Sequence, residues 1–251
     1  MAKSPRRVNY VLRPAKAVEL SSRTALLAQR LADWSRERSV ELVGCRVPAS
    51  DTALTGALEN AGFRMIELQL RATLAPLRPE DAKPPRITVR TADSSDRARI
   101  LSIASSAFHL GRYHADPRFP REAADRRYRT WMERALAERE GTWVAVAGPP
   151  GAARGFLHAE ISGTAADIRL AAVDPDGGGI AGPELFRGAL HELARRGVRR
   201  VTARMSAANC AVLNVYASLG FRFDDPESVL HWHSPDASHL VEAGQAGGAR
   251  P

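Results

Sequence analysis

From residue 87 onward, apolar and polar residues recur with periods that are typical of strands and helices. Residues 87–90 alternate as a strand does, and Asp93 is placed to cap a helix that includes Ile100. A second helix is predicted over residues 123–137. This part of the chain is therefore expected to begin with one strand and two helices.

The following segments predict more strands than helices. Turn residues separate them, and Gly197 and Gly220 are placed to end two helices. Strands are predicted over residues 143–147, 155–161, 166–173, 198–205 and 229–233, with helices over 184–196 and from Asn209 through Tyr216. This order predicts a mixed α/β (α+β) sheet with helices on its faces.

Prolines and small residues divide the chain. Four prolines fall within residues 76–85, a density that excludes a long helix or a central strand. The last segment is rich in Gly, Ala and Ser, which offer little surface to bury. We predict a smaller partial α/β unit at 1–75, a linker at 76–86, a larger unit at 87–233 and a flexible tail at 234–251.

The first unit resembles part of the second. Aligning residues 62–64 with 220–222 places Arg46 opposite Arg204 and Asp51 opposite Asn209 at a constant offset. The hypothesis is that residues 1–75 are a degenerate copy of the larger unit. That copy would be chemically silent, because Leu58 stands where the larger unit has Tyr216.

Composition indicates a soluble globular protein. The sequence has 44% hydrophobic and 25% charged residues, and no apolar run approaches a membrane span, so we expect a cytoplasmic protein without membrane contact. The net charge of +8 would suit either nucleic acid or an anionic small ligand, and charge alone does not choose between them. It comes mostly from arginines interleaved with acidic residues, which indicates a compositional bias rather than a phosphate-binding stripe, so nucleic-acid binding is not expected. Cys45 and Cys210 lack the partners of a disulfide framework and are expected to be small buried residues.

The segment 166–196 combines a predicted strand, a glycine-rich loop and a helix. Such a loop can turn its amides toward a pyrophosphate at the positive end of the helix. No Lys-Ser/Thr pair follows, which excludes a P-loop. Gly177, Gly179 and Gly182 fit a dinucleotide spacing, but the next strand ends without the acidic residue that binds ribose. An ordinary tight turn remains the alternative.

Two motifs resemble the GNAT superfamily of N-acetyltransferases. Residues 173–181, Val-Asp-Pro-Asp-Gly-Gly-Gly-Ile-Ala, are similar to the coenzyme A loop of that family, Gln/Arg-x-x-Gly-x-Gly/Ala, although Asp176 replaces its Gln or Arg. Residues 209–221 are similar to its helix that opens with Asn and ends in Tyr-x-x-x-Gly-Phe. The resemblance implies that acetyl-CoA is the cosubstrate and that Tyr216 is the acid beside its sulfur. The residues implied to bind it are Val173, Gly177, Gly178, Gly179, Ile180, Ala181, Gly182, Asn209 and Tyr216.

The general base is left open between two residues. His158 and Glu160 share one face of their predicted strand, and either could accept a proton from an amine, while surface or core roles fit both equally well. His231 and His233 flank Trp232 on one strand face, but the sequence spaces no third ligand to join them. No metal is therefore expected.

The acceptor is expected to be a small-molecule amine. Segment 108–117, the helix with Tyr128 and Trp131, and residues 230–232 are similar to acetyltransferases of dTDP-linked 4-amino-4,6-dideoxyhexoses (dTDP-fucosamine type). Another amine, such as an antibiotic, amino acid, polyamine or protein N-terminus, and a noncatalytic coenzyme-binding module are the alternatives. A monomer or homodimer is expected. The candidate acceptor residues are Phe108, His109, Arg112, His114 and Trp131.

Overall fold

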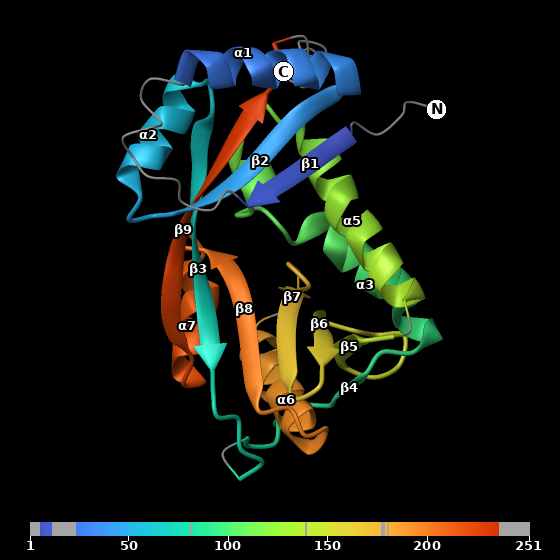
Figure 1. Ribbon diagram of the computed structural model, residues 1–251. Helices are drawn as coiled ribbons and strands as arrows, with labels where there is room; N and C mark the ends of the chain where they lie inside the picture. The colour runs from blue at the N-terminus through green and yellow to red at the C-terminus, as the bar shows by residue number, and fades with distance from the viewer. Residues whose placement is uncertain are drawn as a thin grey trace.

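One nine-stranded mixed sheet organises the protein (Figure 1). The computed structural model describes residues 6–11, 24–80, 82–138, 140–176, 179 and 181–235. The sheet order is β1-β2-β9-β3-β8-β7-β6-β5-β4. Its strands are β1 Arg6–Val11, β2 Val40–Pro48, β3 Arg64–Leu74, β4 Val89–Thr91, β5 Thr142–Ala147, β6 Gly155–Ser162, β7 Ala165–Val173, β8 Arg200–Ser206 and β9 Arg222–His233. The predicted mixed α/β class is confirmed.

Helices cover both faces of this sheet. They are α1 Thr24–Arg38, α2 Thr52–Asn60, α3 Arg97–Ser106, α4 Arg112–Ala115, α5 Arg121–Ala137, α6 Ala181–Arg195 and α7 Cys210–Ser218, with a 3₁₀ helix at Ser94–Asp96. One core joins α6 and α7 to the sheet through Leu185 and Tyr216, and a second joins α3 and α5 to the opposite face through Ile100 and Met132. Among the described helices, none has the length and apolar character that a membrane span requires.

A single offset relates the two halves of the sheet. Helices α2 and α7 begin at Thr52 and Cys210, 158 residues apart, and their caps Asp51 and Asn209 accept equivalent backbone N–H groups. The parallel pairs β1–β2 and β7–β8 keep the same offset, since position 7 opposes 42 as 165 opposes 200. The repeated unit is therefore strand, helix, strand, helix, strand.

The two repeats exchange their last strands. Strand β3 pairs with β8, strand β9 pairs with β2, and β3 and β9 lie antiparallel to each other. Within the predicted linker, Leu77 is buried and its N–H donates to the carbonyl of Arg199. Because the sheet is continuous across both segments, the first 75 residues supply a strand to the centre of the molecule. The boundaries proposed for two separate units stay a prediction.

Several sequence expectations need correction. Helix α4 was not predicted, and β9 begins at Arg222, seven residues before the expected start at 229. Cys45 is buried as expected, but Cys210 is exposed, because it opens α7 on the side that faces solvent. Ser234, assigned to the flexible tail, is buried and its N–H donates to the Glu41 carbonyl at 2.9 Å. The rest of that tail, residues 236–251, lies outside the described residues.

Candidate active site

Strands β7 and β8 are parallel neighbours that pair along only part of their length (Figure 1). Residues 165–168 of β7 pair with residues 200–203 of β8, and pairing then stops although both strands continue. The outer edges of the two strands remain paired, β7 with β6 and β8 with β3. Beyond Ile168 and Ala203, two unpaired backbone edges therefore face each other.

The start of α6 lies against the end of β7. A Cβ placed on Gly182 would stand 3.8 Å from the Val173 side chain, and Ala181 is buried. Arg99 forms an ion pair with Asp174, which also accepts the N–H of Asp176 at 3.3 Å. Gly179 is exposed, whereas the predicted loop residues Gly177, Gly178 and Ile180 lie outside the described residues. Strand β7 therefore ends at Val173, five residues beyond its last pair with β8, and the start of α6 lies beside that end.

Tyr216 is buried on α7, beneath α6. Its ring packs edge to face on Phe186 at 5.0 Å and on Phe221 at 4.6 Å between centroids. Burial raises the pKa of Tyr216 well above its ordinary value, and the charge of Asp167 adds to this shift. Its hydroxyl forms no hydrogen bond with a described residue. The phenol is therefore held by aromatic packing and protonated at neutral pH.

The two candidate bases share a sheet face, as predicted, but lie in different environments. His158 is buried, and neither of its ring nitrogens has a hydrogen-bond partner among the described residues. Burial, with a contribution from the charge of Arg169, lowers its pKa to about 4. Glu160 is exposed and forms an ion pair with Arg169 at 3.3 Å. His158 is thus neutral at pH 7, whereas Glu160 is solvated.

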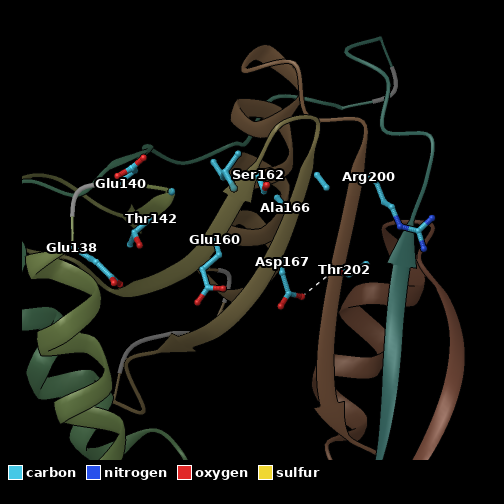
Figure 2. A pocket seen from close by; sticks show the side chains of 12 residues that line it. Glu138, Glu140, Thr142, Glu160, Ser162, Ala166, Asp167, Arg200 and Thr202 are labelled. Atoms are coloured by element: carbon cyan, nitrogen blue, oxygen red, sulfur yellow. Dashed lines mark hydrogen bonds between the residues drawn. The ribbon is translucent and has the colours of Figure 1, made fainter. Parts of the chain in front are cut away.

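Glu160 borders an acidic hollow of about 460 Å³ (Figure 2). Figure 2 shows Thr142, Glu160 and Asp167 on adjacent strands, with Thr202 donating to Asp167 at 2.9 Å. The hollow surrounds the paired part of β7 and β8, and neither Tyr216 nor Val173 lines it. It is therefore distinct from the place where the unpaired edges diverge.

The acceptor residues predicted between α3 and α5 only partly come together. Phe108 stacks on Tyr128 at 4.3 Å, and His114 stacks on the same ring at 5.7 Å while it bonds Asp125 at 2.8 Å. Arg112 acts electrostatically on Tyr128 and on residues of β2 and β3. His109 is exposed, 3.5 Å from Arg121, and Trp131 is half-buried with Arg169 over its ring. Phe108, Arg112 and His114 thus surround Tyr128, and His109 joins them only through the ring of His114, at 6.0 Å between centroids.

Sequence reasoning missed a polar group from the first repeat. Glu67 and Gln69 of β3 are buried, and Gln69 donates from Nε2 to Glu67 Oε1 at 2.5 Å. Arg46 of β2 donates from Nε to Gln69 Oε1 at 3.0 Å. The signal was available, because polar residues occupy every second position from 67 to 73, as on one face of a strand.

A third polar residue does join His231 and His233, contrary to expectation. Asp116, which follows α4, accepts from His231 Nδ1 and His233 Nε2 at 2.7 Å each through one oxygen, Oδ2. All three side chains are buried, and their polar atoms lie within 4.8 Å of one another. Burial opposes ionisation of Asp116, but the two histidine hydrogen bonds hold its pKa well below the usual range.

The geometry of this cluster is that of a hydrogen-bonded network. Distances of 2.7 Å to a shared oxygen are typical of charge-assisted hydrogen bonds, whereas ligands around a tetrahedral zinc ion stand about 3.3 Å apart. The backbone N–H of Arg118 donates a hydrogen bond to the other oxygen of Asp116, Oδ1, at 3.0 Å. Asp116 therefore fixes the end of the predicted acceptor loop to β9. The expected absence of a metal stays a prediction.

Comparison with known structures identifies the fold. No family model matches the chain. A GCN5-related N-acetyltransferase from Sphaerobacter thermophilus superposes with a TM-score of 0.61 and 19% identity, covering 83% of this chain and 67% of that one. This chain has the GNAT fold. A tandem GNAT protein from the clavulanic acid biosynthesis pathway superposes with a TM-score of 0.57 and 16% identity, over 83% of this chain and 69% of that chain.

Two curated relatives of this GNAT-fold chain have a named activity. A mycothiol acetyltransferase from Nocardia farcinica is 29% identical over 208 residues, which cover 79% of this chain and 65% of that protein. A mycothiol acetyltransferase from Tsukamurella paurometabola is 29% identical over 180 residues, which cover 66% and 59%. The chain thus spans about three fifths of the length of the relatives that it matches.

Proposed function

We propose that this chain is an acetyl-CoA-dependent N-acetyltransferase that acetylates a primary amine of a small molecule by direct transfer. The observation that carries the proposal is the partial pairing of β7 and β8, whose facing edges are free beyond Ile168 and Ala203. Helix α7, which follows β8, carries the buried Tyr216, the tyrosine that the resemblance to the family motif implies as the acid. The names of the two curated relatives support the same activity.

Acetyl-CoA fits the groups that these elements offer. The free edges of β7 and β8 can exchange backbone hydrogen bonds with the amides of an extended pantetheine chain, as strands do with an added strand. The pyrophosphate would lie at the N-terminus of the fifteen-residue helix α6. Asp176, where the family has Gln or Arg, would need to point away from this anion.

In the proposed reaction, a neutral amine attacks the thioester carbonyl directly. A backbone N–H on the free edge of β7, near Val173, would stabilise the oxyanion as it forms. Tyr216 would donate a hydrogen bond to the departing sulfur. An alkyl thiol has a pKa of about 8.5, lower than that of a buried phenol, so we expect stabilisation of the thiolate by hydrogen bonding rather than full proton transfer from Tyr216.

The acceptor that we favour carries an anionic group. Burial lowers the pKa of Arg46 and of Arg127, and the positive charge of Arg112 lowers both further. Among the described residues, Arg112 and Arg127 form no ion pair with a carboxylate. An anion on the acceptor would relieve this mutual repulsion, which supports a phosphorylated or nucleotide-linked amino sugar over a polyamine.

An acceptor screen tests the proposal. Thiol release from acetyl-CoA would be measured with glucosamine 6-phosphate, a dTDP-linked 4-amino sugar, glucosamine and spermidine, and mass spectrometry would identify the acetamide. We expect acetylation of at least one amine, with anionic acceptors preferred, and a lower rate in Tyr216→Phe. An enzyme that binds acetyl-CoA but acetylates none of these amines would contradict the proposal.

A further inference from the structure

Strand β3, which the first repeat inserts beside β8, carries a buried carboxylate next to the proposed acyl-transfer site. We infer that Glu67 binds the ammonium group of the acceptor and accepts its proton, so that the first repeat supplies acceptor recognition although it lacks a counterpart of Tyr216. This inference rests on the proposed acetyl transfer and adds to it the general base and a substrate class.

The register places Glu67 on the acceptor side of the sheet. Ala72 and Leu74 pack on the face that α6 covers, so the alternate residues Glu67 and Gln69 face the side of α4 and α5. Gln69 stands opposite Ser206, three residues beyond Ala203, where β8 is no longer paired with β7. Glu67 therefore lies on the edge of the region where the two strands diverge.

One oxygen of this carboxylate lacks a hydrogen bond of normal geometry. The side chain is only 8% exposed, Oε1 is bonded to Gln69, and the hydroxyl of Ser206 is the neighbouring donor that acts on the carboxylate without forming such a bond to Oε2. A buried acceptor oxygen without such a bond is unfavourable, and the N–H groups of an ammonium would satisfy it. The unsatisfied Oε2 is thus the observation that indicates a ligand at this position.

The groups around Glu67 suit a base rather than a permanent ion pair. Burial raises its pKa, while Arg112, Gln69, Ser206 and Arg46 act in the opposite direction and the net shift remains upward. Tyr128 is the facing group on α5, and its own pKa, raised by burial to about 12, is raised in part by Glu67. A carboxyl with an elevated pKa takes a proton from an ammonium more readily than an ordinary carboxylate does.

Comparison of the repeats indicates what else the acceptor carries. Arg204 forms an ion pair with Glu227, and the equivalent pair 158 residues earlier is Arg46 with Gln69. Arg46 thus bonds an amide where Arg204 has a carboxylate, and among the described residues its one ion pair is with Glu227, which it shares with Arg204, at 3.9 Å. The pair of Glu67 and Arg46 therefore fits an acceptor that bears an amine and, a few bonds away, a carboxylate or phosphate.

The proposed acetyl transfer conserves atoms and charge. The acceptor enters as an ammonium, and Glu67 takes one proton to leave the neutral amine. Nitrogen bonds to the acetyl carbon, the carbon–sulfur bond breaks, and the second nitrogen proton reaches the thiolate through solvent while the Tyr216 hydroxyl stabilises the thiolate by a hydrogen bond. Glu67 then returns its proton to solvent, so that the products are the acetamide, coenzyme A thiol and one proton.

The test compares Glu67→Gln and Glu67→Asp with wild type and with Glu59→Gln, a matched change at an exposed glutamate of the same repeat. The acceptor is glucosamine 6-phosphate or whichever probe of the screen is acetylated. We expect Glu67→Gln to lower kcat/KM for the acceptor about 100-fold and to remove the acidic limb of its pH profile, with the KM for acetyl-CoA and the melting temperature unchanged. Glu67→Asp should retain that limb, and Arg46→Gln should lower the preference for the anionic probe over glucosamine.

The outcomes separate the two proposals. If Glu67→Gln matches wild type while Tyr216→Phe is impaired, the role of Glu67 is overturned and the acetyltransferase proposal stands. An increase in the KM for acetyl-CoA alone, or an unchanged pH profile in Glu67→Gln, would also overturn it. If wild type acetylates no amine, the acetyltransferase proposal fails, and the inference fails with it.

Discussion

His158 is predicted to make the protein sensitive to mild acid. The ring is buried without a hydrogen-bond partner among the described residues, and its pKa is lowered from the ordinary 6.5 to about 4. In the unfolded chain His158 therefore binds a proton as the pH falls below 6.5, whereas in the folded chain it remains neutral down to about pH 4. By linkage, the folded state loses stability as the pH falls through this window.

The size of the effect follows from the two pKa values. One pKa unit corresponds to about 1.4 kcal/mol, and integration from pH 7 to pH 5 gives a loss of about 2 kcal/mol from this one residue. In His158→Leu this contribution disappears. At pH 7 the variant should be about 1 kcal/mol more stable than wild type, because an apolar side chain of similar size replaces two unsatisfied nitrogens.

Urea unfolding followed by tryptophan fluorescence at pH 7 and pH 5 would measure both free energies. His109→Leu is the matched control, because His109 is exposed. We expect the free energy difference between His158→Leu and wild type to grow by about 2 kcal/mol at pH 5, and the control to follow wild type. A ring titration near pH 6.5 by NMR, or equal pH dependence in His158→Leu and wild type, would refute the burial argument.

Four further substitutions test the site and the packing. Tyr216→Phe should lower kcat about 10- to 100-fold with little change in the KM for acetyl-CoA, since it removes one hydrogen bond to a developing charge; equal turnover would exclude that role. Asp116→Asn should lower the free energy of unfolding in urea by about 3 kcal/mol, because two buried histidines lose their anionic partner, and a loss below 1 kcal/mol would show that the network is not stabilising. Gly188→Ala should lower the free energy of unfolding by about 1 to 3 kcal/mol, because the new Cβ would stand 2.5 Å from the Cβ of Val89. Gly56→Ala should raise the free energy of unfolding, because no atom lies within 4 Å of the new Cβ in its helix. Equal effects of the two variants would contradict the packing.

Local periodicity predicted most elements of the second repeat but not their neighbours in the sheet. Strand β7 begins one residue before the expected start at 166, and Asn209 caps α7 as proposed. The exchange of β3 and β9 could not be predicted, because pairing between strands so distant in the sequence, such as Gln69 with Ser206, leaves no local signal. Helix α4 is a single turn, and so short an element lacks the repeating apolar stripe that identifies longer helices.

The candidate site was predictable where one element carries it. His158 and Glu160 were placed on one face because alternation along a strand is a local property. Asp116 and Glu67 were not identified, because each interacts with residues more than 100 positions away in the sequence. Asp116 is hydrogen-bonded to His231, and Glu67 interacts with Ser206. Residues that act through tertiary contacts become visible only when the topology is known.

The exchange of strands makes the acceptor side and the fold dependent on each other. Gln69 stands opposite Glu227 in the β3–β9 pairing, and the two residues are equivalents at the 158-residue offset, so the local symmetry axis of the repeats passes between them. Removing residues 1–75 would take β3 from between β8 and β9 and leave both with exposed, unpaired edges. The first repeat can therefore lose the chemistry of a GNAT unit and still be required, because the second repeat has no strand of its own to place in that position. The same exchange holds the polar residues on the face of β3 opposite α6, Glu67 among them, beside the end of β8.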